Sequence, residues 1–274
     1  MTREQHLVFC KKCSNRKMDM QKGIICSLTE KQADFTEKCP DFKLDEKIKN
    51  DTLKNIELIR PNKQRAKIAQ ILIWSVMLFD IISGISSYLQ YNLLTSLQNG
   101  ETFSDDILNA NDTREQIVGI LYIVIFIASA VTFIQWFRRA YYNLNLRTNC
   151  DHTDGWAAGS WFVPIISLFR PYQIMKEMWI ETSKLIKLKT PDFNINNSTL
   201  IIGLWWALWI ISNYIGNYVL KNAFKAGTID DLLNSTIGDI TMSTIGIPLA
   251  ILTVLMIKSY SSMEEKIAEL EKNE

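Results

Sequence analysis

Four cysteines near the start of the chain have the residue type and part of the spacing of a metal site. Cys10 and Cys13 stand in the sequence CKKC, and Cys26 and Cys39 follow in the pattern C-x2-C-x12-C-x12-C. Four thiolates, two of them on one short knuckle, suit the tetrahedral coordination of zinc. A second close pair, which would strengthen the prediction, is lacking. We therefore expect these four cysteines to bind a zinc ion.

Two other interpretations of the cysteines stay open: an iron–sulfur cluster, and reduced cysteines without metal. Cys39 precedes a proline, as in some iron–sulfur sequences, but the other spacings differ. A disulfide framework is disfavoured because the N-terminus is expected in the cytoplasm. His6 is a lone neighbour that we do not expect among the ligands. Cys150 and His152 form no site by their spacing and are expected to be surface residues.

A second chemical signal is Asp80, an acid inside an otherwise uncharged apolar stretch. Such an acid costs several kcal/mol unless it is paired, neutral or hydrated. Asn213 lies at a similar depth in a later apolar stretch, and Ser160 and Ser167 flank the break at Pro164. We expect the acid, the amide and the two serines to share a polar cluster. This cluster would form either the floor of a solute cavity or a hydrogen-bonded contact between helices.

The elements that must position these groups are long apolar stretches at 68–89, 117–137, 200–220 and 240–257, in which Asp80 is the one charged residue. At about 1.5 Å per residue, each can cross roughly 30 Å of hydrocarbon. Alternation with a period of two is absent, which disfavours a membrane β-barrel. The sequence therefore predicts an all-α integral membrane protein with four transmembrane helices.

The basic residues of the connections predict the orientation of these helices. They gather before the first span and between the second and third spans, whereas the connection from the first to the second span has a single arginine. By the positive-inside rule both termini are expected in the cytoplasm, with Asn99–Thr113 and Thr228–Ser235 outside. We expect the plasma (inner) membrane. The basic groups are Arg60, Lys63, Arg65, Lys67, Arg138, Arg139, Arg147, Lys184, Lys187 and Lys189.

The stretch GSWFVPIISLFRPYQ, residues 159–173, begins like a span and then breaks. Its apolar part, 156–169, is too short to cross, and Pro164 interrupts a helix. We expect a re-entrant segment here, followed by an amphipathic interfacial helix at about 171–188. The alternative is a fifth span, kinked at Pro164 and extending to Ile180, although it would place the next lysines and the C-terminus outside.

Three pieces of sequence, WFRRAYYNL (136–144), GSWFVPIISLFRPYQIMKEMWIETS (159–183) and LWWALWIIS (204–212), resemble domain-of-unknown-function family 4328. This is a group of bacterial multi-pass membrane proteins, and the similarity runs from about 66 to 260. The family has no established activity, so the resemblance implies fold and location but no catalytic residues. The residues of the resembling motifs are Trp136, Arg139, Asn143, Trp161, Pro164, Arg170, Pro171, Tyr172 and Gln173.

The expected organisation is a cysteine-rich zinc-binding module at 1–42, a charged linker at 43–65, the membrane domain at 66–260 and a cytoplasmic helical tail at 261–274. Near-equal numbers of basic and acidic residues, 30 and 29, argue against a nucleic-acid partner.

The favoured function is a non-enzymatic membrane scaffold or sensor, in contact with the lipid bilayer and with a protein partner at the cytoplasmic face. The alternative is a small transporter or intramembrane enzyme whose polar cavity is lined by the re-entrant segment. Paired acids, catalytic triads and charged pathways are missing from the sequence, which favours the first interpretation.

Overall fold

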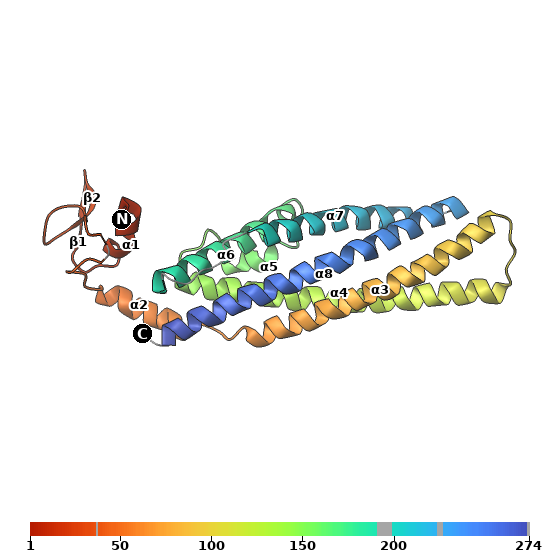
Figure 1. Cartoon of the computed structure of the whole chain (residues 1–274), viewed down its shortest axis with the longest axis horizontal. Helices are drawn as coiled ribbons and strands as arrows, with labels where there is room; N and C mark the ends of the chain where they lie inside the picture. Colours follow the sequence, from red (N-terminus) through yellow and green to blue (C-terminus); the bar gives the residue numbers. More distant parts are fainter. Residues whose placement is uncertain (37, 191–198, 224–226, 273–274) are drawn as a thin grey trace. The chain divides into compact units, whose positions relative to one another are not determined.

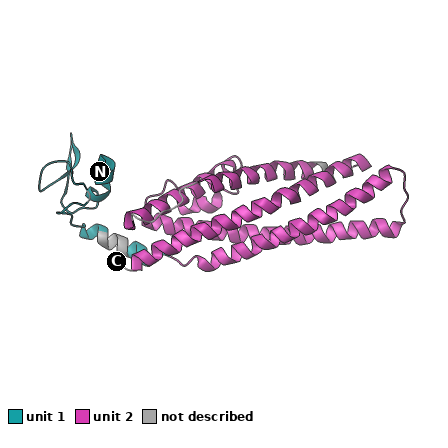
Figure 2. Cartoon of the chain, viewed as in Figure 1, with its two compact units in different colours: residues 1–59 teal, residues 60–274 magenta. Residues whose placement is uncertain are grey.

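The computed structural model describes residues 1–36, 38–190, 199–223 and 227–272. The chain divides into two compact units, residues 1–59 and 60–274 (Figure 2). The stretch 43–65, expected as a linker, contributes to both units. The last two residues of the expected tail lie outside the described residues.

The first unit is built around a short hairpin that was not predicted from the sequence. Strands β1 (Arg16–Asp19) and β2 (Gly23–Cys26) pair antiparallel. Asp19 closes the turn by accepting hydrogen bonds from the backbone N–H groups of Gln21 and Lys22, at 2.9 and 2.7 Å. Gly23 follows with a φ of 72°, a conformation that glycine adopts without steric cost.

Two helices flank the hairpin in the sequence. Helix α1 (Arg3–Cys10) starts with a reciprocal capping box between Thr2 and Gln5. Helix α2 (Glu46–Glu57) is capped by Asp45, which accepts from the N–H of Lys47 at 2.9 Å. Asp45 also forms a 2.8 Å ion pair with Arg16, so the cap of α2 is tied to the first strand.

The second unit contains four helices that are long and apolar enough to cross a membrane, counted over the described residues. Each contains one of the four expected spans, so that prediction is confirmed. Figure 1 shows the four running alongside one another in alternating directions. The helices are α3 (Lys63–Gln98), α4 (Asp105–Arg147), α7 (Leu200–Ala223) and α8 (Ile229–Lys272).

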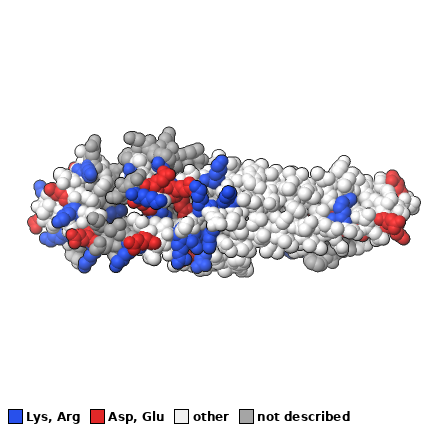
Figure 3. All heavy atoms as spheres, turned by 90° about the horizontal axis from the view of Figure 1, so that it is seen from below, with Lys and Arg blue, Asp and Glu red and all other residues white. Residues whose placement is uncertain are grey.

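Charged side chains of this unit gather toward its two ends. On the face drawn in Figure 3, a broad band between the ends carries no Lys, Arg, Asp or Glu. Large apolar side chains of the membrane-length helices are exposed, for example Ile85, Ile120 and Phe126. In water this exposure would be unfavourable, whereas in a bilayer it is the ordinary lipid-facing surface.

Helix α8 packs on both α3 and α7, and α3 also packs on α4. Small residues let α8 approach its neighbours closely, as is usual between membrane helices. A Cβ atom on Gly238 would collide with Val219 of α7. Over the described residues, α4 and α7 are not among the helix pairs in extensive contact. The four helices therefore form an arc in the order α4, α3, α8, α7.

The stretch expected to break is divided between helix α5 (Asp154–Gly159), the single turn η1 (Ile166–Leu168) and helix α6 (Arg170–Lys189). Ile165 has a φ of 69°, which is rare for a β-branched residue and marks a sharp reversal. The five-span alternative requires one long helix over 156–180, and the structure has none there.

The amphipathic helix expected at about 171–188 is α6, with Pro171 in its first turn. It packs on α4, α7 and α8. Lys176 and Lys184 face solvent, and Met178 and Ile186 are fully buried. The helix is therefore docked against the bundle through its apolar face.

Buried polar contacts hold one end of the bundle together. The side-chain amide of Asn143 donates to Glu264 at 2.7 Å and to the carbonyl of Arg60 at 2.8 Å. Asn62 donates to the second carboxylate oxygen of Glu264 at 3.2 Å. One helical turn later on α4, Arg147 forms a two-point ion pair with Glu271, at 2.8 and 2.9 Å. The tail of α8 is thus part of the core.

Candidate functional site

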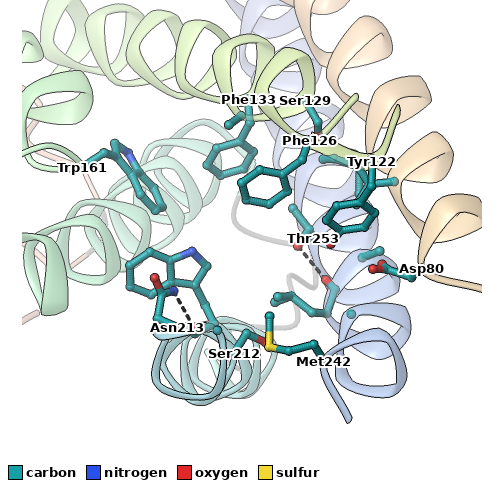
Figure 4. Close-up of a pocket in the computed structure, with 18 of the residues that line it drawn as sticks. Asp80, Tyr122, Phe126, Ser129, Phe133, Trp161, Ser212, Asn213, Met242 and Thr253 are labelled. Atoms are coloured by element: carbon teal, nitrogen blue, oxygen red, sulfur yellow. Dashed lines mark hydrogen bonds between the residues drawn. The ribbon is translucent and has the colours of Figure 1, made fainter. Parts of the chain in front are cut away.

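A cavity of about 520 Å³ lies within the helical unit, walled by α3, α4, α7 and α8 and by the segment that follows α5 (Figure 4). Five residues of its wall are also exposed at the surface: Phe126 of α4, Phe162 of the segment, and Asn213, Asn217 and Leu220 of α7. The cavity therefore opens on the side where α4 and α7 do not pack together. In a bilayer this opening would face lipid.

Asp80 contributes the acidic group of the cavity wall. Its side chain is 2 % exposed, and its carboxyl faces the hydroxyl of Tyr122 on α4. One carboxyl oxygen, Oδ2, has no hydrogen-bond partner among the described residues. The carboxyl fits between α3 and α8 because position 246 is glycine: a Cβ there would lie 2.5 Å from Oδ2 and 2.7 Å from Oδ1. Tyr122 and Gly246 were not predicted.

Asn213 lines the same cavity from α7, so the structure brings the two central residues of the predicted cluster to one cavity. They do not form the expected hydrogen-bonded cluster within the described structure, because the Asn213 amide donates to the Trp209 carbonyl of its own helix at 2.8 Å. Ser160 is fully buried and Ser167 half-buried, and neither lines the cavity.

The segment after α5 reaches the cavity with aromatic rings instead of serines. Trp161 lies edge-on to Phe133 and Trp209, at centroid distances of 5.7 and 5.6 Å. The indole N–H of Trp206 donates to the carbonyl of Leu168 at 3.1 Å. These contacts fasten the irregular segment to α4 and α7 and close one end of the cavity.

The other residues of the family-like motifs contact neighbouring side chains or backbone outside the cavity. Arg170 packs its guanidinium 2.7 Å from the ring of His152 and 5.8 Å from the ring centre of Trp156. Among the rest, Asn143 belongs to the polar contacts at the end of the bundle. Trp136 and Pro171 are buried, Arg139 and Tyr172 are half-buried, and Pro164 and Gln173 are exposed.

Cys150 and His152 are half-buried, and so less exposed than the surface position expected for them. Tyr141 explains the difference: its hydroxyl donates to Glu177 at 2.7 Å and accepts from the backbone N–H of His152 at 3.1 Å, which holds this connection against α6. Burial, helped by the negative charge of Glu177, raises the pKa of the Cys150 thiol to about 12. This cysteine is therefore a poor nucleophile at neutral pH.

The four cysteines of the first unit line one small pocket of about 130 Å³. They come from the end of α1, the turn after it, the end of β2 and the segment that follows. Burial raises the pKa of Cys10, and the three other thiols add to the effect. Nε2 of His6 is hydrogen-bonded to the carbonyl oxygen of Phe35 at 2.6 Å.

The described side chains are not arranged as a metal site. Among the described residues, no group of three or more His, Cys, Asp and Glu could hold a metal ion in these positions.

Four apolar helices around a cavity place the chain in the class of multi-pass α-helical membrane proteins. It belongs to the family described as Domain of unknown function (DUF4328), which matches residues 99–262, more than half of the chain. The resemblance drawn from the sequence motifs is thereby confirmed, although the match begins later than the expected residue 66. Comparison with curated proteins and with solved structures found no match.

Proposed function

We propose that this protein is a non-enzymatic module of the plasma membrane whose N-terminal unit binds zinc and contacts a protein partner at the cytoplasmic face. The observation that carries the proposal is the gathering of Cys10, Cys13, Cys26 and Cys39 around one pocket. These residues are spread over 30 positions of the sequence, and a chain has little reason to collect four thiols in one place without a shared ligand.

The chemistry of the donor set fits zinc. Zinc prefers thiolate sulfur at about 2.3 Å in a tetrahedral arrangement. Cys13 and Cys10 are joined by a short turn in which the N–H of Cys13 bonds the carbonyl of Cys10 at 3.2 Å, so both can face one point. Metal binding would require the four side chains to rotate toward a common centre, since they are not yet arranged as ligands. Coupling of binding to such ordering is usual for structural zinc.

Elemental analysis of the full-length protein, purified in detergent, tests the metal site. We expect about one zinc per chain, and loss of most of it in Cys13→Ser. Cys150→Ser is the matched control, because this fifth cysteine lies in the helical unit, outside the pocket. Equal zinc content in the two variants, or none in the unaltered protein, would refute the assignment.

The orientation is a further part of the proposal. The excess of Lys and Arg in the connections supports cytoplasmic termini, and the exposed apolar stretch at 162–169 supports a segment that enters the membrane from that side. Reporter fusions after residue 60, after residue 101 and at the C-terminus check this. We expect the first and third in the cytoplasm and the second outside; an external C-terminus would contradict the four-span arrangement.

A second candidate function is a carrier or receptor for a molecule taken from the bilayer. The cavity favours it, because its volume lies in the range of small-molecule sites and it holds a few polar groups in an apolar wall. Uptake of a bound compound into proteoliposomes distinguishes a carrier from a receptor. A carrier transports the compound, whereas a receptor binds it without transport.

A further inference from the structure

We propose that the cavity of the helical unit binds a lipophilic monovalent cation, with Asp80 as its counter-ion and aromatic rings as its walls. This inference deepens the second candidate function and rests on it. It concerns the chemical class of the ligand, which the cavity wall indicates through its charge, its rings and its opening.

The cavity wall carries an acidic group and no basic one among the described residues. Asp80 and Tyr122 are the ionisable groups among the described residues that line the cavity, and no Lys or Arg lies among them. The neighbouring helix α8 offers Gly246 at this point, which supplies no partner. One oxygen of the Asp80 carboxyl is buried and without a hydrogen-bond partner in the described structure. A bound cation would supply the pairing that an intramembrane acid otherwise lacks.

Aromatic rings make up much of the remaining wall. Figure 4 shows Tyr122, Phe126 and Phe133 of α4 lining one side, and Trp161 closing the adjacent side. Trp205 and Trp209 of α7 complete the set. The faces of such rings attract cations, most strongly where water is excluded, and they also accommodate an apolar body. A carboxyl combined with several rings selects a cation with apolar substituents over a small hydrated ion.

The opening agrees with a ligand that arrives through the bilayer. The cavity reaches the surface between α4 and α7, beside exposed apolar residues such as Phe126 and Leu220. A compound dissolved in the hydrocarbon can therefore enter sideways. An anion would meet the unpaired carboxyl, and a neutral compound would leave it unpaired.

Binding of tetraphenylphosphonium to the full-length protein in detergent, measured by equilibrium dialysis, tests the inference. Tetraphenylborate, of similar shape and opposite charge, is the comparison ligand. We expect saturable binding of the cation alone. Asp80→Asn should weaken it by roughly tenfold or more, as expected when a buried charge pair loses one partner. Asp239→Asn is the matched control, because this acid on α8 does not line the cavity, and it should leave the affinity within about twofold.

A second variant covers the case in which Asp80→Asn does not fold. Phe126→Ala removes a ring at the rim of the cavity, and Ile123→Ala truncates an exposed neighbour on α4 that does not line it. We expect Phe126→Ala to bind tetraphenylphosphonium several-fold more weakly and Ile123→Ala to bind it as tightly as the unaltered protein. Equal binding of cation and anion would overturn the proposal that the ligand is a cation, and so would cation binding that Asp80→Asn leaves unchanged. Either result would still leave the cavity as a ligand site.

No saturable binding of either ion would overturn the inference. Uptake of a neutral lipophilic compound into proteoliposomes would then test the second candidate function separately.

Discussion

The carboxyl of Asp80 on α3 lies directly against the backbone of Gly246 on α8, at a point where a Cβ atom would meet both carboxyl oxygens and Cγ within 2.7 Å. Such a contact is closer than real Cβ atoms allow, so alanine at 246 must displace either the acid or the helix. The relationship explains how an acid that is 2 % exposed is accommodated in the helical unit.

Gly246→Ala should therefore destabilise the protein, by about 1–3 kcal/mol, as overpacking of a filled core does. Thermal unfolding in detergent, followed by the near-ultraviolet signal of the tryptophans, measures the change. Gly119→Ala on α4 is the matched control, because its added Cβ would have no atom within 4 Å. If the two variants unfold at the same temperature, Asp80 and Gly246 are not in contact.

The polar contacts at the other end of α8 yield a second prediction. Asn143→Ala would leave Glu264 without its 2.7 Å hydrogen bond and would remove both bonds to the backbone of Arg60. A buried group left unsatisfied costs about 1–3 kcal/mol. Asn145→Ala is the comparison, since that half-buried amide bonds only to the carbonyl of Tyr141 in its own helix, at 3.0 Å, among the described contacts. A loss of stability no larger at 143 than at 145 would contradict the role of Asn143.

A third prediction follows from the raised pKa of Cys150, about 12 against an ordinary 9.0. At pH 8 the thiolate fraction should be about a thousandfold below that of an ordinary thiol, and alkylation by iodoacetamide correspondingly slow. Because the folded state holds this proton more tightly, its stabilising contribution is complete below about pH 9 and is lost as the pH rises toward 12. Mass spectrometry of the Cys150 peptide measures the rate, with denatured protein as the reference; equal rates in both would show that the thiol is not buried.

Much of the fold could be predicted because apolar stretches of membrane length have few alternatives to a helix. The four spans, the break near Pro164 and the start of α6 at Arg170 all follow from local sequence. The hairpin of the first unit could not be predicted, since β1 is largely polar and its pairing with β2 depends on contacts elsewhere in the unit.

The site was predicted only in part, for a related reason. Depth along a helix can be counted from the sequence, which is how Asp80 and Asn213 were expected at one level. Rotation about the helix axis cannot be counted in this way, because it depends on which helices are neighbours. The contact of Asp80 with Gly246 and its orientation toward Tyr122 therefore emerged only from the packing of α3, α4 and α8. Glycine in an apolar helix could have suggested a close approach, but not the residue that makes it.

X-ray absorption at the zinc K-edge of the full-length protein tests most directly the central claim, that Cys10, Cys13, Cys26 and Cys39 bind one zinc ion. We predict a first shell of four sulfur atoms at about 2.3 Å and no nitrogen or oxygen ligand. The sample is the unaltered protein purified without added metal or affinity-tag histidines. A shell with nitrogen or oxygen ligands, or a protein that carries no zinc, would contradict the proposal.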